Sequence, residues 1–211
     1  MKRYGYDWAG LWLINTHNGL KNKGIKPVDI NDYPAIKEWL DNGGVAYSGK
    51  IYKGLSQIEK RSDQGDTPYN LRNCAYMEDF SKPKIIWGEI SDKSKFAFDF
   101  FGKYIPEATS FYMKGECIEY LLSALNSSVS EWLFSKVGTT TGVGTIRWKK
   151  YTIEQLIVAK PSAEQQNIHL AAFNNLKVGK MSITDFECFS NKLMYDIYNL
   201  TSDEIQYIEN K

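Results

Sequence analysis

A basic run that lacks any carboxylate is the part of the sequence best suited to binding an anionic partner. From Lys136 to Lys150 the chain carries basic residues, three consecutive threonines and no Asp or Glu. Cations neutralise DNA phosphates, hydroxyls fix the register, and an arginine can form a bidentate bond to a guanine edge. A solvated surface strip has the same composition, so the run by itself leaves both interpretations open. The cations are Lys136, Arg147, Lys149 and Lys150.

Asp66-Thr67-Pro68-Tyr69 partly matches the Asn/Asp-Pro-Pro-Tyr tetrapeptide that holds a flipped adenine in methyltransferases. It lacks the second proline, and no glycine-rich strand-to-helix turn for S-adenosylmethionine precedes it. A turn that closes on Tyr69 accounts for the same residues. A degenerate methyltransferase fragment is therefore kept only as an alternative.

The sequence lacks the residue spacing that other catalytic and cofactor-binding motifs require. The stretch from Gly138 to Gly144 lacks the Gly-Lys-Ser/Thr of a phosphate loop and the third glycine of a dinucleotide loop. No serine lies in a nucleophile elbow, and the carboxylates near Lys82 and Lys84 lack the Glu-x-Lys arrangement of a metal-dependent nuclease. We expect no catalytic residue, cofactor or metal site in this chain. The carboxylates weighed for a nuclease are Glu78, Asp79, Glu89 and Asp92, near Lys82 and Lys84.

The cysteines, histidines and charges limit the class of protein. Cys74, Cys117 and Cys188 form no CxxC pair, which favours reduced thiols, and neither histidine has a second ligand at metal spacing. No apolar run approaches the roughly 18 residues that span a bilayer, so we expect a cytoplasmic protein without membrane contact. The net charge of +1 combines a basic excess before residue 160 with an acidic excess after it.

The elements that must position the basic run are strands and a helical hairpin. Alternating apolar residues predict strands at Lys84–Ile90, Lys95–Asp99 and Thr109–Met113. Helical spacing from Ile118 to Leu133, interrupted at Asn126-Ser127-Ser128, predicts two helices packed on the sheet. A flexible loop from Gly138 to Gly144 then leads into a short strand, Thr145 to Lys150.

The N-terminal part predicts one strand and two helices. Leu11–Thr16 is short and apolar and ends in His17-Asn18-Gly19, as a buried strand that enters a loop would. Pro34 in a first turn and Gly43 just past the end bound a short helix. Apolar spacing predicts a second helix over Lys50–Arg61.

The C-terminal part predicts helices that begin at capping boxes. Thr152 with Gln155, Ser162 with Gln165, and Thr201 with Glu204 each have the required spacing. The expected fold is α+β, a curved mixed or antiparallel sheet with flanking helices and a helical C-terminal region. The expected division is a recognition domain over residues 1–161 and helices over 162–211, packed on it or on partner domains.

Several motifs together resemble the TaqI-like C-terminal specificity domain of adenine-N6 DNA methyltransferases and type IIG restriction enzymes. The segment Arg61–Tyr76, followed by Phe80 and Lys82–Trp87, carries most of the resemblance. Lys2-Arg3-Tyr4 is similar to the end of a stretch that opens the domain in this family, so Met1 is expected at an artificial boundary. Further matches are Tyr33–Lys37, Leu122–Ser127, Thr140–Gly144 with Arg147–Tyr151, and Tyr195–Ile205.

The resemblance implies a non-catalytic domain that grips double-stranded DNA opposite a methyltransferase and reads bases in the major groove. S-adenosylmethionine and Mg would then belong to the methyltransferase and, where present, the nuclease domain of the parent polypeptide, and not to this chain. An interaction module that binds protein and never contacts DNA is the other alternative. The candidate DNA-binding residues are His17, Asn18, Lys21, Lys23, Arg61, Tyr69, Asn70, Arg72, Thr139, Thr140, Thr141, Arg147, Lys149 and Lys150.

Overall fold

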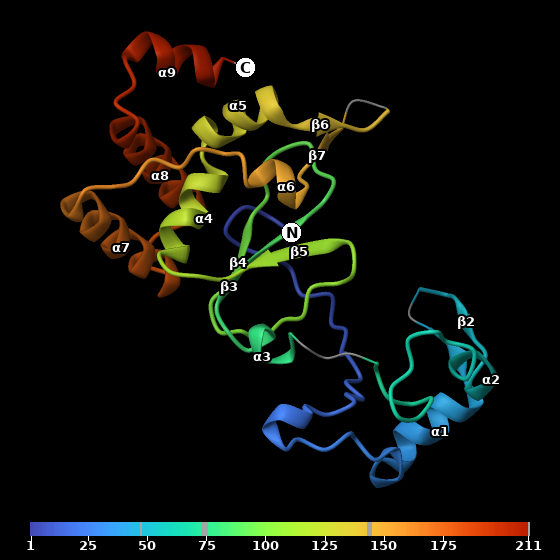
Figure 1. Ribbon diagram of the computed structural model, residues 1–211. Helices are drawn as coiled ribbons and strands as arrows, with labels where there is room; N and C mark the ends of the chain where they lie inside the picture. Colours follow the sequence, from blue (N-terminus) through green and yellow to red (C-terminus); the bar gives the residue numbers. More distant parts are fainter. Residues whose placement is uncertain (47, 73–75, 143–144, 211) are drawn as a thin grey trace. The chain divides into compact units, whose positions relative to one another are not determined.

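The computed structural model describes residues 1–46, 48–72, 76–142 and 145–210 (Figure 1). The chain divides into two compact units, a smaller one of Gly10–Glu78 and a larger one of Met1–Ala9 with Asp79–Lys211. Helices and short antiparallel sheets both occur, which confirms the α+β class. Cys74, Val143 and Gly144, which the sequence motifs include, lie outside the described residues.

A three-stranded antiparallel sheet lies at the centre of the larger unit. β3 (Lys84–Gly88) pairs on one side with β4 (Ala97–Asp99) and on the other with β5 (Ser110–Met113). Ile85 of β3 lies opposite Phe98 of β4, and both side chains are buried. The sequence therefore predicted these three strands correctly, because each is a short apolar run bounded by turn residues.

Two consecutive helices pack against this sheet, as the sequence predicted. α4 (Ile118–Asn126) and α5 (Ser128–Val137) meet at Ser127, whose hydroxyl accepts the backbone N–H of Ser130 and caps α5. The buried Asn126 side chain fixes α4 to the sheet, since its amide bonds both the N–H and the C=O of Phe96, at 3.0 and 2.8 Å. A single side chain thus satisfies the backbone at the start of β4.

The C-terminal region is helical, and it packs on α4 and α5. α7 (Ala163–Lys177) and α9 (Ser202–Glu209) both begin at the predicted capping boxes, with Ser162 and Thr201 as the caps. α8 (Ile183–Ile197) contacts α4, α5 and α7. The capping box predicted at Thr152 is wrong: that residue lies inside the short helix α6 (Lys150–Ile153), where its side chain is buried.

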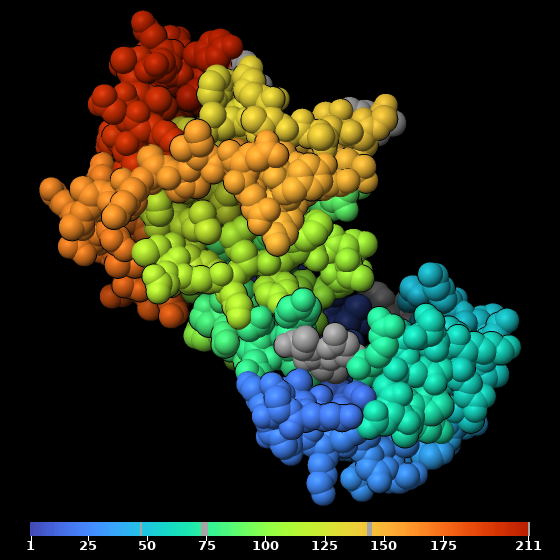
Figure 2. Space-filling model, viewed as in Figure 1, coloured from blue at the N-terminus to red at the C-terminus, as the bar shows by residue number. Residues whose placement is uncertain are grey.

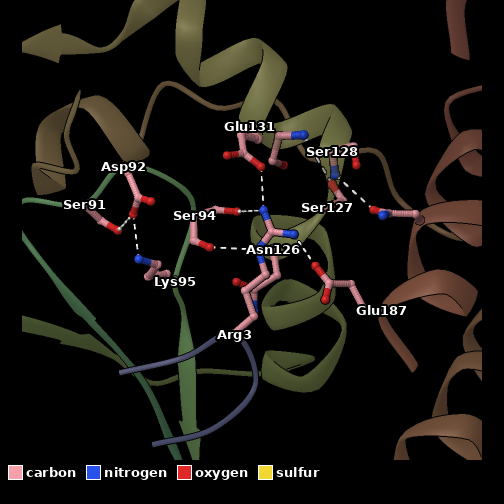
Figure 3. Close-up of polar contacts among 12 residues, drawn as sticks. Arg3, Ser91, Asp92, Ser94, Lys95, Asn126, Ser127, Ser128, Glu131 and Glu187 are labelled. Carbon is pink, nitrogen blue, oxygen red and sulfur yellow. Dashed lines mark hydrogen bonds and ion pairs between the residues drawn. The ribbon is translucent and has the colours of Figure 1, made fainter. Parts of the chain in front are cut away.

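The N-terminal segment joins the larger unit through Arg3 (Figure 3). Its guanidinium pairs with Glu131 of α5 and Glu187 of α8, and it donates to the backbone C=O of Ser94 at 2.9 Å. The two carboxylates are about three-quarters buried, so the contact is better shielded from solvent than a typical surface ion pair. Arg3 therefore links the N-terminal segment to two helices that are distant in sequence.

The smaller unit contains short elements. α1 (Pro34–Asn42) has the predicted limits, with Pro34 in its first turn and Gly43 at its C-cap. β1 (Gly44–Val45) pairs with β2 (Ile51–Tyr52), and α3 (Met77–Phe80) lies at the boundary between the units. The remaining elements are η1 (Lys21–Lys23), η2 (Ile30–Asp32) and α2 (Leu55–Ile58).

The helix predicted over Lys50–Arg61 is wrong in its first half. Residues 51 and 52 form β2, and the helix begins only at Leu55. Gly54 between them has φ 65°, and a Cβ there would lie 2.1 Å from the backbone oxygen of Asp41. A helix cannot pass through this left-handed residue, so the close approach of α1 overrides the apolar spacing.

The buried strand predicted over Leu11–Thr16 is also wrong. These residues form no strand, and Trp12 and Leu13 are exposed by 86% and 61%. Thr16 alone is buried, where its backbone C=O accepts the N–H of Leu71 at 2.9 Å. An apolar run becomes a strand only where a neighbouring strand supplies backbone partners, and β1 and β2 pair with each other.

Candidate nucleic-acid interface

The basic run forms a β-hairpin in the larger unit, so the loop predicted at Gly138–Gly144 is shorter than expected. β6 (Thr139–Thr140) pairs antiparallel with β7 (Ile146–Arg147), and Thr139 lies opposite Arg147. Beyond these pairs the backbone N–H of Thr141 donates to the C=O of Thr145 at 2.7 Å. The hairpin projects beside α5 and α6 (Figures 1 and 2). Both β6 threonines are exposed.

Trp148 anchors this hairpin to the core of the unit. Its side chain is 1% exposed and stacks on Phe134, with ring centroids 4.0 Å apart and planes inclined by 10°. Its indole N–H donates to the C=O of Ser91 at 3.2 Å, and its own C=O accepts the indole N–H of Trp87 at 2.8 Å. The buried aromatic pair and these bonds fix the backbone next to Arg147.

Arg147 is half-buried and ion-paired. Its Nη2 lies 3.1 Å from Oε1 of Glu89, and the side chains are exposed by 38% and 29%. The Nε atom of Arg147 is buried and has no hydrogen-bond partner among the described residues. Glu89 is also bonded through its backbone, because its C=O accepts the N–H of Trp148 at 2.6 Å.

The two lysines that follow lie at the base of the hairpin. Lys149 is half-buried, with its ammonium 5.7 Å from the ring centroid of Tyr151. Lys150 begins α6 and forms an exposed ion pair with Glu154 at 3.6 Å. Exposed pairs of this kind contribute at most about 1 kcal/mol, so this lysine can exchange its carboxylate for a phosphate at little cost.

The first group of candidates in the smaller unit shapes a lysine-bearing loop. His17 Nδ1 accepts the backbone N–H of Gly19 at 3.1 Å, and the Asn18 side chain bonds Asp66. Lys21 and Lys23 of η1 are exposed, and Lys23 pairs with Glu78. The His17 side chain is therefore bonded within the loop and the Asn18 side chain to Asp66 of the same unit, while Lys21 and Lys23 are exposed.

The second group in the smaller unit forms a bonded turn around Asn70. This side chain is 1% exposed, its amide donates to the C=O of Val28 at 2.9 Å, and its oxygen accepts the Thr67 hydroxyl at 2.6 Å. Arg61 donates to the C=O of Asn70 and of Pro68, at 3.1 and 3.3 Å. Asn70 and Arg61 thus satisfy backbone oxygens in a part-buried turn.

Tyr69 and Arg72 belong to the same turn. The Tyr69 hydroxyl donates to Asp41 at 2.6 Å, and the Lys37 ammonium lies 5.5 Å from the Tyr69 ring centroid. Hydrogen bonds from Lys37 and then from Tyr69 lower the pKa of Asp41 below its ordinary value. Arg72 is exposed, and its backbone N–H donates to the C=O of Asp63 at 3.0 Å.

The TaqI-like C-terminal specificity domain family matches residues 15–158 of the chain, more than half of its length. The chain belongs to this family. A specificity domain of this kind selects the DNA target in restriction-modification systems and is not itself the catalyst. A search of curated proteins gave no match. No helix in the described ranges is long and apolar enough to cross a membrane.

In this specificity domain the carboxylates weighed for a nuclease each have a basic partner. Asp79 pairs with Lys114, whose hydrogen bond lowers its pKa, and Asp92 pairs in the same way with Lys95. Across the described part of the chain, His, Cys, Asp and Glu nowhere form a group of three that would hold a metal ion. Cys117 and Cys188 are free and exposed.

The tertiary structure adds Glu89 to the candidate residues of the specificity domain. No local signal links it to the hairpin, because it lies far from Arg147 in sequence and outside the acid-free run. The predicted residues separate into two groups. Thr139, Thr140, Thr141, Arg147, Lys149 and Lys150 lie together in the larger unit, and His17, Asn18, Lys21, Lys23, Arg61, Tyr69, Asn70 and Arg72 lie in the smaller unit.

Proposed function

We propose that this specificity domain binds double-stranded DNA sequence-specifically through the β6–β7 hairpin. The observation that carries the proposal is the hairpin itself, which exposes the β6 threonines and carries the half-buried Arg147 next to the buried Trp148. Threonines 139 to 141 would position the backbone, Lys149 and Lys150 would neutralise phosphates, and Arg147 would contact a base edge. A two-stranded ribbon has the width that the major groove admits.

The loop of the smaller unit would supply further phosphate contacts. Lys21 and Lys23 are exposed in this loop, and Arg72 is exposed elsewhere in the same unit. His17 and Asn18 would shape this loop, and Arg61, Tyr69 and Asn70 would hold the turn behind it, because their polar groups are committed to internal bonds. Phosphate contacts of this type fix orientation without reading sequence.

We further propose that the domain serves a bacterial adenine-N6 methyltransferase, with or without a nuclease, in the cytoplasm. The parent polypeptide would supply the S-adenosylmethionine and Mg sites and the catalytic residues. The chain alone should give no heat of binding with S-adenosylmethionine in calorimetry and should methylate no duplex. A saturable binding heat would contradict this division of labour.

The salt dependence of duplex binding by the full chain tests the proposed interface. Fluorescence anisotropy between about 50 and 200 mM salt should give a log-log slope of about −0.9 for each phosphate contacted. The double variant Lys149→Gln/Lys150→Gln should make that slope less negative by the amount expected for two phosphate contacts. A chain that binds protein partners alone would show no slope to lower.

The matched control removes the same charge elsewhere. Lys180 and Lys192 are exposed in the helical region after the match, so Lys180→Gln/Lys192→Gln should leave the slope unchanged. Equal losses in both double variants would indicate an effect of net charge and would contradict the proposed interface.

Arg147→Ala tests sequence reading separately from phosphate contact. Its affinity for a preferred duplex, selected from a random pool, should fall by about 1 to 3 kcal/mol, and one base position should lose its preference. An equal loss on all sequences would assign Arg147 to a phosphate.

A further inference from the structure

Glu89 is a carboxylate placed directly beside the cation that the proposed function assigns to base reading. Its Oε1 lies 3.1 Å from Nη2 of Arg147. Carboxylates repel DNA phosphates, and the run from Lys136 to Lys150 that forms the hairpin carries no acidic residue of its own. An acidic side chain at this position weakens general DNA binding, so its presence calls for a compensating role.

The backbone around the pair holds both residues in place. Ile90, next to Glu89, forms an antiparallel bridge with Arg147, and the N–H of Trp148 donates to the C=O of Glu89. Trp148 is in turn stacked on Phe134. The backbone of both residues is therefore held in place. A side chain can keep another in one orientation only when its own backbone is fixed in this way.

The contact leaves the reading edge of the guanidinium available. Each terminal nitrogen of an arginine carries two N–H groups, so Nη2 can donate one to Glu89 and keep one for a ligand. A bidentate bond to guanine takes one N–H from each of the two terminal nitrogens in an end-on approach. The third nitrogen, Nε, is buried and has no hydrogen-bond partner among the described residues.

We propose that Glu89 is a positioning residue for sequence reading: it orients the Arg147 guanidinium toward a guanine and so sets the base preference at that position. The proposal rests on the proposed function, since it requires that the hairpin contact DNA. Without the carboxylate, the arginine keeps its charge and its attraction to DNA, but it samples several orientations and also donates hydrogen bonds to phosphates or other base edges.

The experiment compares base preferences of full-length variants on one probe, a duplex pool with a randomised centre of about 10 base pairs, one helical turn. Bound duplexes are sequenced for the wild type, Glu89→Gln, Arg147→Ala and Glu154→Gln. The last variant is the matched control, because it removes the same charge from the exposed ion pair of Lys150 in the neighbouring helix.

The expected result is a guanine preference in the wild type that falls by about fivefold in Glu89→Gln, the factor that corresponds to about 1 kcal/mol for a half-exposed pair. Total affinity for the pool should rise equally in Glu89→Gln and Glu154→Gln, since each loses one negative charge. Only the first should relax a base position, and it should be the one that Arg147→Ala relaxes. The midpoints of thermal unfolding should agree among the variants, which excludes a merely structural role.

The outcomes separate this inference from the proposed function. An unchanged preference in Glu89→Gln, with a relaxed one in Arg147→Ala, overturns the positioning role and leaves the interface standing. Equal relaxation in Glu89→Gln and Glu154→Gln also overturns it, because the cause is then net charge. Failure of the wild type to enrich any sequence overturns the proposed function and the inference together.

Discussion

Candidate residues of the same chemical types have opposite surroundings in the two units. In the hairpin of the larger unit, Thr139 and Thr140 are exposed, and the buried side chains of Trp148 and Phe134 anchor the backbone. In the turn of the smaller unit, Asn70 and Arg61 bond part-buried backbone oxygens, although that segment carries most of the family resemblance. Polar residues in a recognisable motif therefore need not be the ones that contact a ligand.

The reason lies in the length of the elements. The larger unit has a sheet covered by helices, so apolar packing fixes the hairpin and its polar groups remain available. The smaller unit has strands of two residues and helices of nine or fewer, and it uses side-chain hydrogen bonds to hold its loops. A buried carbonyl without a partner costs about 1 to 3 kcal/mol, so these bonds are a condition of its fold.

Acidification should destabilise the larger unit more than the smaller one. Of the changes considered, it has the largest expected effect on stability. His169 lies in the core of the larger unit with Nε2 2.8 Å from the Ser123 hydroxyl, and burial lowers its pKa to about 4. The neutral ring is favoured in the folded state, so the stability it contributes is complete above the unfolded pKa of about 6.5. This contribution to the free energy of unfolding should be lost progressively as the pH falls from about 6.5 to about 4. The total loss should be about 3 kcal/mol.

Hydrogen exchange of the full chain at several pH values measures this loss in each unit. Peptides of the larger unit should lose protection through that pH range, and those of Gly10–Glu78 should lose less. His169→Gln, which cannot titrate, should remove the difference between the units. If the larger unit of that variant still lost more protection than the smaller unit, the effect would be traced to other titratable groups.

Asn70→Ala should produce the reverse pattern. It leaves the C=O of Val28 and the Thr67 hydroxyl without their partner, which should destabilise the smaller unit by about 2 kcal/mol. Hydrogen exchange should show lost protection in residues 10–72 and unchanged protection in α4 and α8. Asn31→Ala is the control, because Asn31 is exposed and bonds only a neighbouring side chain and its own turn. Equal destabilisation by both variants would mean that burial of Asn70 has no special role.

Removing one positive charge from either unit should give the smallest effect, a change in the salt dependence of duplex binding. These variants compare the DNA contacts of the two units directly. Lys150→Gln in the hairpin unit and Lys21→Gln in the smaller unit should each reduce the log-log salt slope of duplex binding by about 0.9. Anisotropy titrations measure both. A change in the Lys150 variant alone would confine DNA contact to the larger unit, and a change in the Lys21 variant alone would remove the hairpin from the interface.

Local patterns determined much of the fold. The capping boxes at Ser162 and Thr201 and the limits of α1 follow from residues within one helical turn, so no distant partner was needed to predict them. Thr152 has the same pattern and fails, because its side chain is buried inside α6. A capping pattern predicts a helix start only where the residue before the helix is free to adopt an extended backbone.

The sequence by itself determined the family, the helical C-terminal region and the basic run, since each depends on residue types and on spacing along the chain. The tertiary structure decided what those residues do. It turned the run into a hairpin anchored by Trp148, left Leu11–Thr16 outside any strand, and brought Glu89 to Arg147. Strand pairing and ion pairs between distant residues depend on which surfaces meet after folding, and a single sequence carries no local signal of that meeting.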